Sequence, residues 1–415
     1  MGDSNIERAA WVGVANAVGR SVESVGIRLF KLDAESLLNE ARRKTGLSDF
    51  GAETFREGFE ILCRALVEEG QLTPIGRYLA HQEILTVLVN RLQVTEWVRR
   101  YPKIRTEEIR EPLFVTGTPR SGTSILHELL SQDLAHRPLL TWESHYPCPP
   151  PEEATRHTDP RIQRSERRVR LWDRMIPSFR AMHEMGGAIP QECIFLTDHD
   201  FKSEHQGGSY NLASYNHWLG QADMRAALEY HKLHLQLLQW RCAKRRWVLK
   251  APAHLGNLPE IFDIYPDARL IWTHRDPVTT ISSGTNVMRA LVALHSDAVP
   301  SAKEVAPDVA MGCEFRFRQA IEQRAKGLLP EAQVADILYQ NLMDDPGGAL
   351  AGVYAKFGMD FPVATREGML DYLRGKPKGK FGRHQHTLEG TGLDREELRE
   401  RFAFYIRQYG IAVES

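Results

Sequence analysis

The sequence has few cysteines, and they form no pattern. Its 415 residues contain five, an odd number without the paired spacing of a disulfide framework or a zinc site: Cys63, Cys148, Cys193, Cys242 and Cys313. Unpaired cysteines of this kind are typical of a reducing compartment. We therefore expect a cytoplasmic protein.

Long apolar runs and an excess of one charge are also missing. No stretch of about 18 apolar residues occurs, and the N-terminus has no basic segment followed by an apolar run, so we expect a soluble protein without an integral membrane segment. Lys and Arg total 53 against 54 for Asp and Glu, a formal net charge of −1. This balance excludes a general attraction to nucleic acid or anionic membranes, so any anion site must be local.

Residues 1–110 have the periodicity of helices. Asp33 can cap a helix that ends at Gly46, and Thr73-Pro74 can begin another whose leucines share one face. These apolar faces could bind a membrane or a partner, but such stripes more commonly pack against the core of the same chain. We predict a helical N-terminal region over residues 1–110.

A loop of small residues follows the apolar segment 113–116. It reads Gly117-Thr118-Pro119-Arg120-Ser121-Gly122-Thr123-Ser124 and opens a helix-like stretch. The Gly117-x4-Gly122 spacing matches a P-loop, in which free N–H groups and the positive end of the helix hold a phosphate. A P-loop NTPase, however, has a lysine after the second glycine, where this chain has Thr123. The loop therefore suits a 5′-phosphate, and Arg120 supplies its cation.

Three apolar segments alternate with helix patterns further along the chain. We predict strands at 247–249, 268–273 and 333–339. This alternation predicts an α/β fold, with a P-loop-like parallel sheet flanked by helices. Ligands of such sheets bind at the carboxyl ends of the strands, where Lys250 and Arg275 fall.

Other polar residues are open to a functional or a structural interpretation. Prolines follow Glu143 and His145, so both lie near a strand end or loop. Six arginines between 161 and 174 form either an anionic-substrate patch or a solvated helix face. Two Gly-Gly pairs bracket the polar and aromatic segment 188–206, which is either a mobile lid over an acceptor site or an ordinary long connection with helices.

Together these segments resemble the sulfotransferases that use 3′-phosphoadenosine 5′-phosphosulfate (PAPS), in particular a bacterial branch that shares the Pro-Arg-Ser-Gly-Thr loop with tyrosylprotein sulfotransferases. The resemblance covers roughly residues 110–410 and rests on that loop and on Arg275-Asp276-Pro277. It implies transfer of a sulfuryl group from PAPS to an acceptor hydroxyl or amine by in-line displacement, with release of adenosine 3′,5′-bisphosphate (PAP). No metal is expected, because arginine and lysine supply the charge that magnesium supplies in a kinase.

The resemblance also implies which residues bind the donor. The 5′-phosphosulfate loop of the family matches Arg120, Ser121, Gly122, Thr123 and Ser124. Arg275, with Ser283 eight residues later, matches the pair that holds the 3′-phosphate. Tyr339 resembles the tyrosine near the adenine. The basic segment with Lys378, Lys380 and Arg383 resembles the loop that closes on the 3′-phosphate.

Catalytic residues follow in the same way. Lys250 resembles the lysine that reaches the oxygen bridging sulfuryl and phosphate, and Arg120 would add to its positive field. Glu143 falls where the tyrosylprotein branch has its catalytic glutamate, although the segment after Arg120 is about two residues longer here. The animal cytosolic enzymes have a histidine two residues after the lysine, where this chain has Pro252. We therefore predict Glu143 as the first candidate for the base and His254 as the second.

The sequence thus predicts a sulfotransferase. The alternative, a P-loop phosphotransferase acting on a nucleotide or small hydroxyl compound, lacks the lysine after Gly122 and has only Asp276 for magnesium. A non-catalytic nucleotide-binding or scaffold protein is a third hypothesis. We expect a catalytic core over 111–415, with an insertion at about 145–245 that shapes the site for a small-molecule, lipid or carbohydrate acceptor. The sequence determines neither the acceptor nor the oligomeric state.

Overall fold

The computed structural model of the protein describes residues 6–27, 29–376 and 388–414. These residues form one five-stranded parallel sheet with the strand order β2-β3-β1-β4-β5. The strands are β1 (Leu113–Thr116), β2 (His136–Pro138), β3 (Arg246–Lys250), β4 (Arg269–His274) and β5 (Val334–Leu338). The predicted α/β class is confirmed, and each predicted strand is present. The short edge strand β2 was not predicted.

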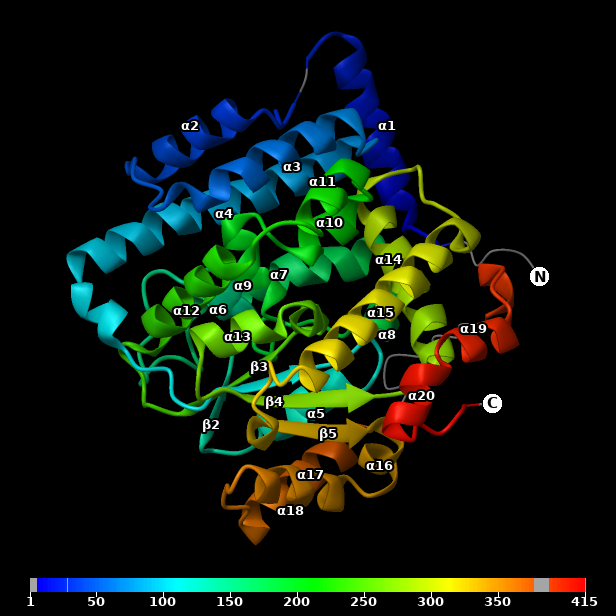
Figure 1. The fold of residues 1–415 in the computed structure, drawn as a ribbon. Coiled ribbons are helices and arrows are strands. Elements are labelled where there is room, and N and C mark those ends of the chain that lie inside the picture. The colour runs from blue at the N-terminus through cyan, green and yellow to red at the C-terminus, as the bar shows by residue number, and fades with distance from the viewer. Residues whose placement is uncertain (1–5, 28, 377–387, 415) are drawn as a thin grey trace.

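Helices dominate the N-terminal region, as predicted. They are α1 (Ala10–Ser24), α2 (Ala34–Thr45), η1 (Glu53–Phe55), α3 (Arg56–Glu68), α4 (Pro74–Arg100) and η2 (Pro102–Thr106). The side chain of Asp33 accepts a hydrogen bond from the Ser36 N–H at 2.9 Å, and Gly46 ends α2 in the left-handed conformation. Figure 1 shows α1–α4 on the side of the molecule opposite α17 and α18.

Helices cover both faces of the parallel sheet because successive side chains of each strand point to opposite faces, and apolar side chains occur on both. Leu113 and Val115 of β1 join a core with α5, α17 and α18 on one face. Phe114 joins a second core on the other face, with α12, α13, α15 and α20. These helices are α5 (Thr123–Leu130), α12 (Arg225–Gln239), α13 (Leu258–Ile264), α15 (Ala302–Ala325), α17 (Pro346–Lys356), α18 (Val363–Arg374) and α20 (Ala403–Tyr409).

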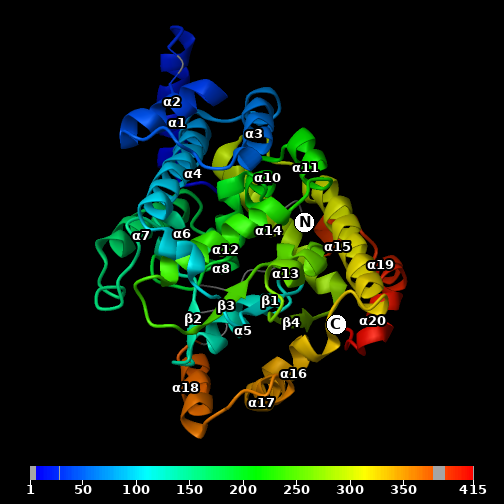
Figure 2. The same ribbon diagram turned by 60° about the vertical axis from the view of Figure 1, so that its left-hand side comes forward.

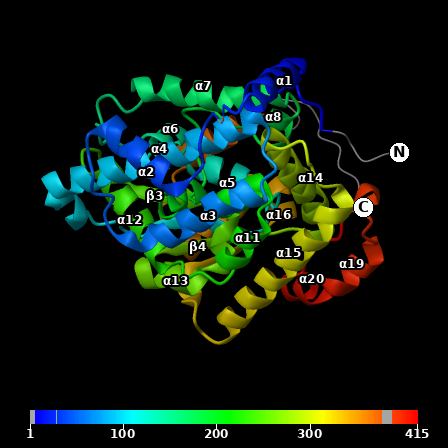
Figure 3. The same ribbon diagram turned by 90° about the horizontal axis from the view of Figure 1, so that it is seen from above.

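The insertion between β2 and β3 is largely helical. It contains α6 (Thr141–His145), α7 (Pro160–Met175), α8 (Phe179–Met182), α9 (Ile194–Thr197), η3 (Asp198–Asp200), α10 (Glu204–Tyr210) and α11 (Ala213–Leu219) before α12. Phe201, Tyr210 and Tyr215 share a hydrophobic core with α2, α3 and α4. The N-terminal helices therefore pack on the insertion, and Figure 3 looks down on them from above.

The remaining elements complete the carboxyl-terminal half. They are η4 (Pro252–Gly256), α14 (Pro277–His295), η5 (Glu331–Gln333), α16 (Tyr339–Asp344), η6 (Glu389–Thr391) and α19 (Arg395–Arg401). In Figure 2, α19 and α20 lie beside α15, where Phe317 stacks on Tyr405 at 3.7 Å between ring centroids. Within the described residues, no helix is both long enough and apolar enough to cross a membrane.

Candidate active site

Predicted site residues lie at the ends of four strands, along one edge of the sheet. The loop 117–122 follows β1, Lys250 ends β3, Arg275 follows β4 and Tyr339 follows β5. Because these strands are parallel, the four positions lie at their common carboxyl edge. The fold therefore gathers three cationic side chains and an aromatic ring from segments far apart in the sequence.

The loop after β1 has a backbone suited to an anion. Gly117 and Gly122 have φ angles of 145° and 94°, and Arg120 has 72°, an uncommon value for a residue with a side chain. A Cβ at Gly122 would lie 2.9 Å from the Tyr339 ring, so glycine allows this close approach. No side chain of the described residues caps the first turn of α5, which leaves its N–H groups available to a negatively charged ligand.

The hydroxyl residues of the loop point in different directions. The Ser121 hydroxyl is buried, 2.7 Å from the Thr273 hydroxyl, and it donates a hydrogen bond to the Thr118 carbonyl at 2.7 Å. Thr123 is buried in the first turn of α5. Ser124 is exposed and accepts a hydrogen bond from the Lys250 amino group at 3.2 Å. Ser121 therefore supports the shape of the loop, whereas Ser124 belongs to the surroundings of Lys250.

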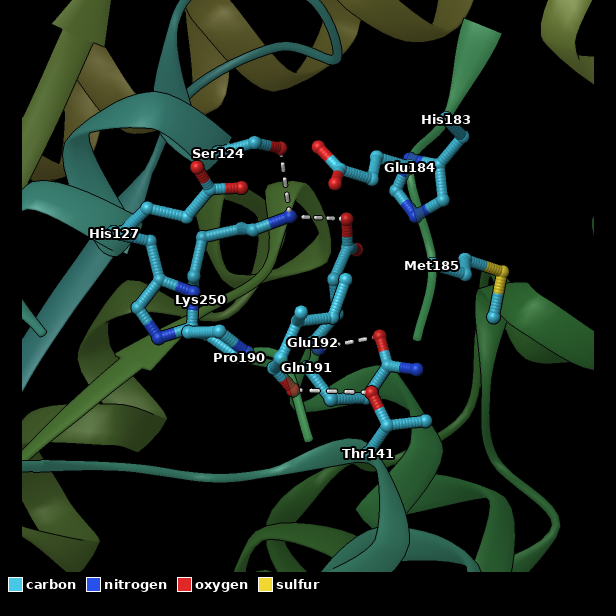
Figure 4. A pocket seen from close by; sticks show the side chains of 12 residues that line it. Ser124, His127, Thr141, His183, Glu184, Met185, Pro190, Gln191, Glu192 and Lys250 are labelled. Carbon is cyan, nitrogen blue, oxygen red and sulfur yellow. Dashed lines mark hydrogen bonds and ion pairs between the residues drawn. The ribbon is translucent and has the colours of Figure 1, made fainter. Parts of the chain in front are cut away.

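Lys250 also contacts a carboxylate that sequence reasoning did not single out. Figure 4 shows its amino group between Ser124 and Glu192, with which it forms an ion pair. Both charged side chains are largely buried, with 5% and 13% of their surfaces exposed. The N–H of Cys193 donates to the Lys250 carbonyl at 2.8 Å, which fixes Glu192 beside the strand end. No motif in the sequence surrounds Glu192, so only this long-range contact identifies it.

The pocket around this ion pair is lined by charged, histidine and apolar side chains. Burial by itself would raise the pKa of Glu192, but the neighbouring Lys250 ammonium outweighs burial and holds the pKa below its ordinary value. Burial lowers the pKa of His183 to about 4 and that of His127 to about 3, so both imidazoles are neutral at pH 7. The other lining residues are Glu128, Thr141, Glu184, Met185, Ile189, Pro190 and Gln191.

Glu143 lies outside this pocket, in a buried ion-pair cluster. Its carboxylate is 2.9 Å from both Arg137 and Arg156 and accepts a hydrogen bond from the Leu140 N–H at 3.0 Å. Burial would raise the pKa of Glu143, but the two arginines outweigh burial and lower it to about 2. A general base must reach the proton that it removes. The position of Glu143 gives no support to its predicted role and indicates a structural one.

The second predicted base, His254, does not line this pocket either. It lies in η4, buried, with its ring edge-on to Phe114 at 5.1 Å between centroids. Burial lowers the pKa of His254 to about 3. His145 is likewise buried, and its Nδ1 is 2.8 Å from the Ser165 hydroxyl. Neither histidine lines the pocket around Lys250.

Arg275 connects the end of β4 to the loop after β1. It donates a hydrogen bond to the Arg120 carbonyl at 2.8 Å, and its guanidinium lies 3.9 Å from the centre of the Tyr339 ring. Its two other nitrogens contact both carboxylate oxygens of Glu414, at 2.6 and 2.7 Å. Ser283 is buried on α14, two turns further along the chain. An arginine that grips a carboxylate with two donors has the geometry to grip a phosphate.

The predicted basic segment cannot be placed. Lys378, Lys380 and Arg383 lie outside the described residues. The pair of Arg120 and Arg275 is therefore the described part of the anion site, with Arg120 donating a hydrogen bond to the Met182 carbonyl at 2.9 Å.

Comparisons with known proteins point in one direction. A family model described as "Sulfotransferase family" matches residues 112–363. Two curated proteins named omega-hydroxy-beta-dihydromenaquinone-9 sulfotransferase Stf3, from Mycobacterium bovis and Mycobacterium tuberculosis, are each 24% identical over 310 residues, or 72% of this chain and 75% of theirs. The solved structure of sulfotransferase STF9 from Mycobacterium avium has a TM-score of 0.83 and 28% identity, covering 92% of this chain and 98% of that one. The solved structure of sulfotransferase STF1 from Mycobacterium tuberculosis has a TM-score of 0.77 and 29% identity, covering 91% of this chain and 100% of that one.

Proposed function

This chain belongs to the sulfotransferase family, and we propose that it transfers a sulfuryl group from PAPS to a hydroxyl group of an acceptor and releases PAP. The observation that carries this proposal is the convergence of Lys250, Arg120 and Arg275 at one edge of the sheet. The family match favours neither a P-loop phosphotransferase nor a non-catalytic scaffold.

The residues at this edge fit a donor with two anionic ends. The open N-terminus of α5, with Arg120, Thr123 and Ser124, suits the 5′-phosphosulfate. Arg275 already binds one anion, the Glu414 carboxylate, and this supports its assignment to the 3′-phosphate. For Ser283 and Tyr339, and for Lys378, Lys380 and Arg383, the assignment to the donor rests on the family resemblance.

We assign the catalytic roles to Lys250 and Glu192. The donor supplies the sulfuryl group, which gains a bond to the acceptor oxygen as its bond to the phosphate oxygen breaks. Lys250 lies beside the loop that would hold that phosphate, so its ammonium can neutralise the charge that grows on the departing oxygen. Glu192 is an ionised carboxylate in the same pocket and can accept the proton of the acceptor hydroxyl.

The ion pair between these residues couples the two roles. Lys250 lowers the pKa of Glu192 while they are paired. When the ammonium turns toward the donor phosphate, Glu192 loses that stabilising cation and becomes a stronger base. The carboxylate therefore gains basicity when Lys250 moves to its catalytic position.

For the acceptor, the need for a metal ion and the cellular location, we propose only a general class or condition. Both curated relatives are named for a hydroxylated dihydromenaquinone, which supports an apolar hydroxyl compound as the acceptor class. Lys250, Arg120 and Arg275 supply positive charge, so the proposed reaction needs no metal ion. All five cysteines are free thiols. This is consistent with a reducing compartment, and we propose a cytoplasmic location.

PAP is expected to stabilise the protein against thermal unfolding more than AMP does at the same concentration. A ligand at 100 times its dissociation constant adds about 2.7 kcal/mol, and AMP lacks the 3′-phosphate that Arg275 would bind. The measurement is the unfolding midpoint of the full chain with each nucleotide. Arg275→Gln should reduce the difference between them. Equal shifts for AMP and PAP in the wild-type protein would refute the 3′-phosphate assignment.

Glu414→Gln is expected to tighten PAP binding up to about fivefold. The Glu414 carboxylate occupies Arg275, and a partly exposed pair of this kind is worth up to about 1 kcal/mol. Isothermal titration calorimetry measures the change. Glu396→Gln, on exposed α19, removes a carboxylate from an ion pair with Arg399 and serves as the control. Identical PAP affinities for both variants would show that Glu414 does not compete with the donor.

A further inference from the structure

Helix α1 turns an apolar stripe toward solvent. Trp11, Val14 and Val18 follow one another at helical spacing and are 43%, 66% and 60% exposed. Val12 and Asn16, on the opposite side of the helix, are buried. The other exposed residues between positions 10 and 18 are two alanines and one glycine, so this face carries no charge. A continuous exposed apolar surface of this kind is typical of a binding site.

This exposure distinguishes α1 from the other N-terminal helices. The apolar faces of α2, α3 and α4 form a shared core with Phe201, Tyr210 and Tyr215 of the insertion. They pack against their own chain, which is the common arrangement for such faces. The apolar stripe of α1 has no such cover among the described residues, because Trp11, Val14 and Val18 all remain exposed.

Exposed apolar side chains on α15 have a different setting. Met311 and Phe315 are 58% and 65% exposed, but Asp308 and Arg318 are exposed at helical spacing on the same face. Isolated apolar residues among charges are normal on a protein surface. The pair on α15 therefore provides a matched comparison for the uncharged stripe of α1.

A stripe of arginines lies on the outer side of α7. The helix contains six arginines and two carboxylates. Arg164, Arg167 and Arg174 are exposed at helical spacing, opposite the buried side of the helix. Arg170 is also exposed and pairs with Glu166. The outer side of α7 therefore carries a local excess of positive charge, although the whole chain is nearly neutral.

The two stripes adjoin. The indole N–H of Trp11 donates a hydrogen bond to the Arg174 carbonyl at 3.3 Å. Figure 3 shows α1 beside the end of α7 at the same edge of the molecule. The carboxylate of Asp297 near α1 is paired with Arg8 and Arg20. Apolar side chains beside free arginines suit a lipid bilayer, where tryptophan and valine enter the interface and guanidinium groups pair with anionic head groups.

The inner side of α7 supports the segment that lines the pocket of Lys250. Glu166 accepts a hydrogen bond from the Gly187 N–H at 2.6 Å. His183 and Ile189, on either side of Gly187 in the chain, line that pocket. The helix that carries the arginine stripe is thus in direct contact with the part of the chain that surrounds the proposed catalytic pair.

We propose that the face formed by the apolar stripe of α1 and the arginine stripe of α7 binds the surface of a lipid bilayer that contains anionic lipids. A second copy of the chain is a poorer occupant, because a symmetric dimer would bring the same arginines together at one interface. Anionic head groups would neutralise these arginines. Binding of this kind needs no spanning helix, and it would bring the enzyme to the phase in which an apolar acceptor dissolves.

The test is co-sedimentation of the full-length protein with vesicles of phosphatidylcholine and phosphatidylglycerol in equal amounts. We expect binding that Val14→Ser combined with Val18→Ser weakens at least about tenfold, because two apolar side chains no longer enter the bilayer. Met311→Ser combined with Phe315→Ser on α15 is the matched control and should leave binding unchanged.

The arginine stripe is tested separately. Arg167→Gln combined with Arg174→Gln should weaken binding to these vesicles at least about tenfold, since each arginine near an anionic surface contributes about fivefold. Vesicles of phosphatidylcholine alone should bind the wild-type protein less tightly. Arg99→Gln combined with Arg100→Gln, two exposed arginines of α4, is the control and should bind as the wild type does.

Wild-type affinity in both the α1 and the α7 variants overturns the inference, as does a wild-type protein that fails to bind the anionic vesicles. Light scattering that finds a dimer, converted to a monomer by Val14→Ser with Val18→Ser, also overturns it, because a second copy would then cover the stripe. The two variants act on different helices, so either one tests the inference if the other does not fold. Vesicle binding needs neither PAPS nor turnover, and its failure leaves the proposed sulfuryl transfer intact.

Discussion

Glu192→Gln is expected to lower kcat by about 10²- to 10⁴-fold while PAP binding stays within a few-fold of the wild type. Glutamine keeps the size of the side chain and a hydrogen-bonding oxygen for Lys250, but it cannot accept a proton at neutral pH. The proposed donor site includes Arg120 and Arg275, whose hydrogen bonds to the Met182 and Arg120 carbonyls do not involve Glu192. Transfer of labelled sulfuryl groups, with PAP calorimetry alongside, separates the two effects.

Glu184→Gln is the matched control for this variant. Glu184 lines the same pocket, but it pairs with Lys376 at 2.7 Å rather than with Lys250. Its substitution should change kcat by less than about tenfold, because no proton transfer is assigned to it. If Glu192→Gln keeps near-normal turnover, the base is another group, and His183 of the same pocket is the next to test.

Glu143→Gln is expected to destabilise the protein by about 3 to 5 kcal/mol, because it removes the carboxylate that neutralises two buried arginines. Arg137 and Arg156 would keep their charges in an environment with little water. Chemical denaturation at pH 7 measures the loss. The rate per folded molecule should fall far less than in Glu192→Gln, since Glu143 does not line the pocket of Lys250.

The pH dependence of stability gives an independent test. The pKa of Glu143 is about 2 in the folded protein against an ordinary value of 4.5, so its stabilising contribution is complete above pH 4.5 and is lost as the pH falls toward 2. The gap between wild type and Glu143→Gln should therefore narrow below pH 4.5. Glu152→Gln removes an exposed partner of Arg241 and should cost less than about 1 kcal/mol. If Glu143→Gln lowered the free energy of unfolding by no more than Glu152→Gln does, that result would contradict a structural role for Glu143.

The residues that we propose for the donor side of the site followed from local sequence. Gly117, Arg120 and Gly122 have positive φ angles, and a loop rich in glycine and other small residues indicates a backbone of this kind. Lys250 and Arg275 stand directly after apolar segments that were predicted as strands. Parallel strands bring their carboxyl ends to one edge by geometry alone. The meeting of these residues could therefore be predicted without coordinates.

The acceptor side could not be predicted in this way. Glu143 matched a family position by its distance from Arg120, but its environment depends on Arg137 and Arg156, which no spacing connects to it. The lid considered for residues 188–206 is instead a set of short helices whose following residues pack on α2, α3 and α4. Burial and pairing are properties of neighbours in space. Arg137 and Arg156 lie 6 and 13 residues from Glu143 without a motif that links them, and Tyr210 is more than 100 residues from α3, on which it packs.

The sequence by itself determined the α/β class, the helical N-terminal region and the small-residue loop between β1 and α5, because each depends on periodicity or on backbone preferences over a few residues. Only the tertiary structure decided which carboxylate stands beside Lys250. A hydrogen bond between Cys193 and the Lys250 carbonyl, 57 residues apart, brings Glu192 to that position, while two arginines sequester Glu143. A carboxylate acts as a base or as a structural anion according to the charges packed around it, and chain folding alone sets those charges.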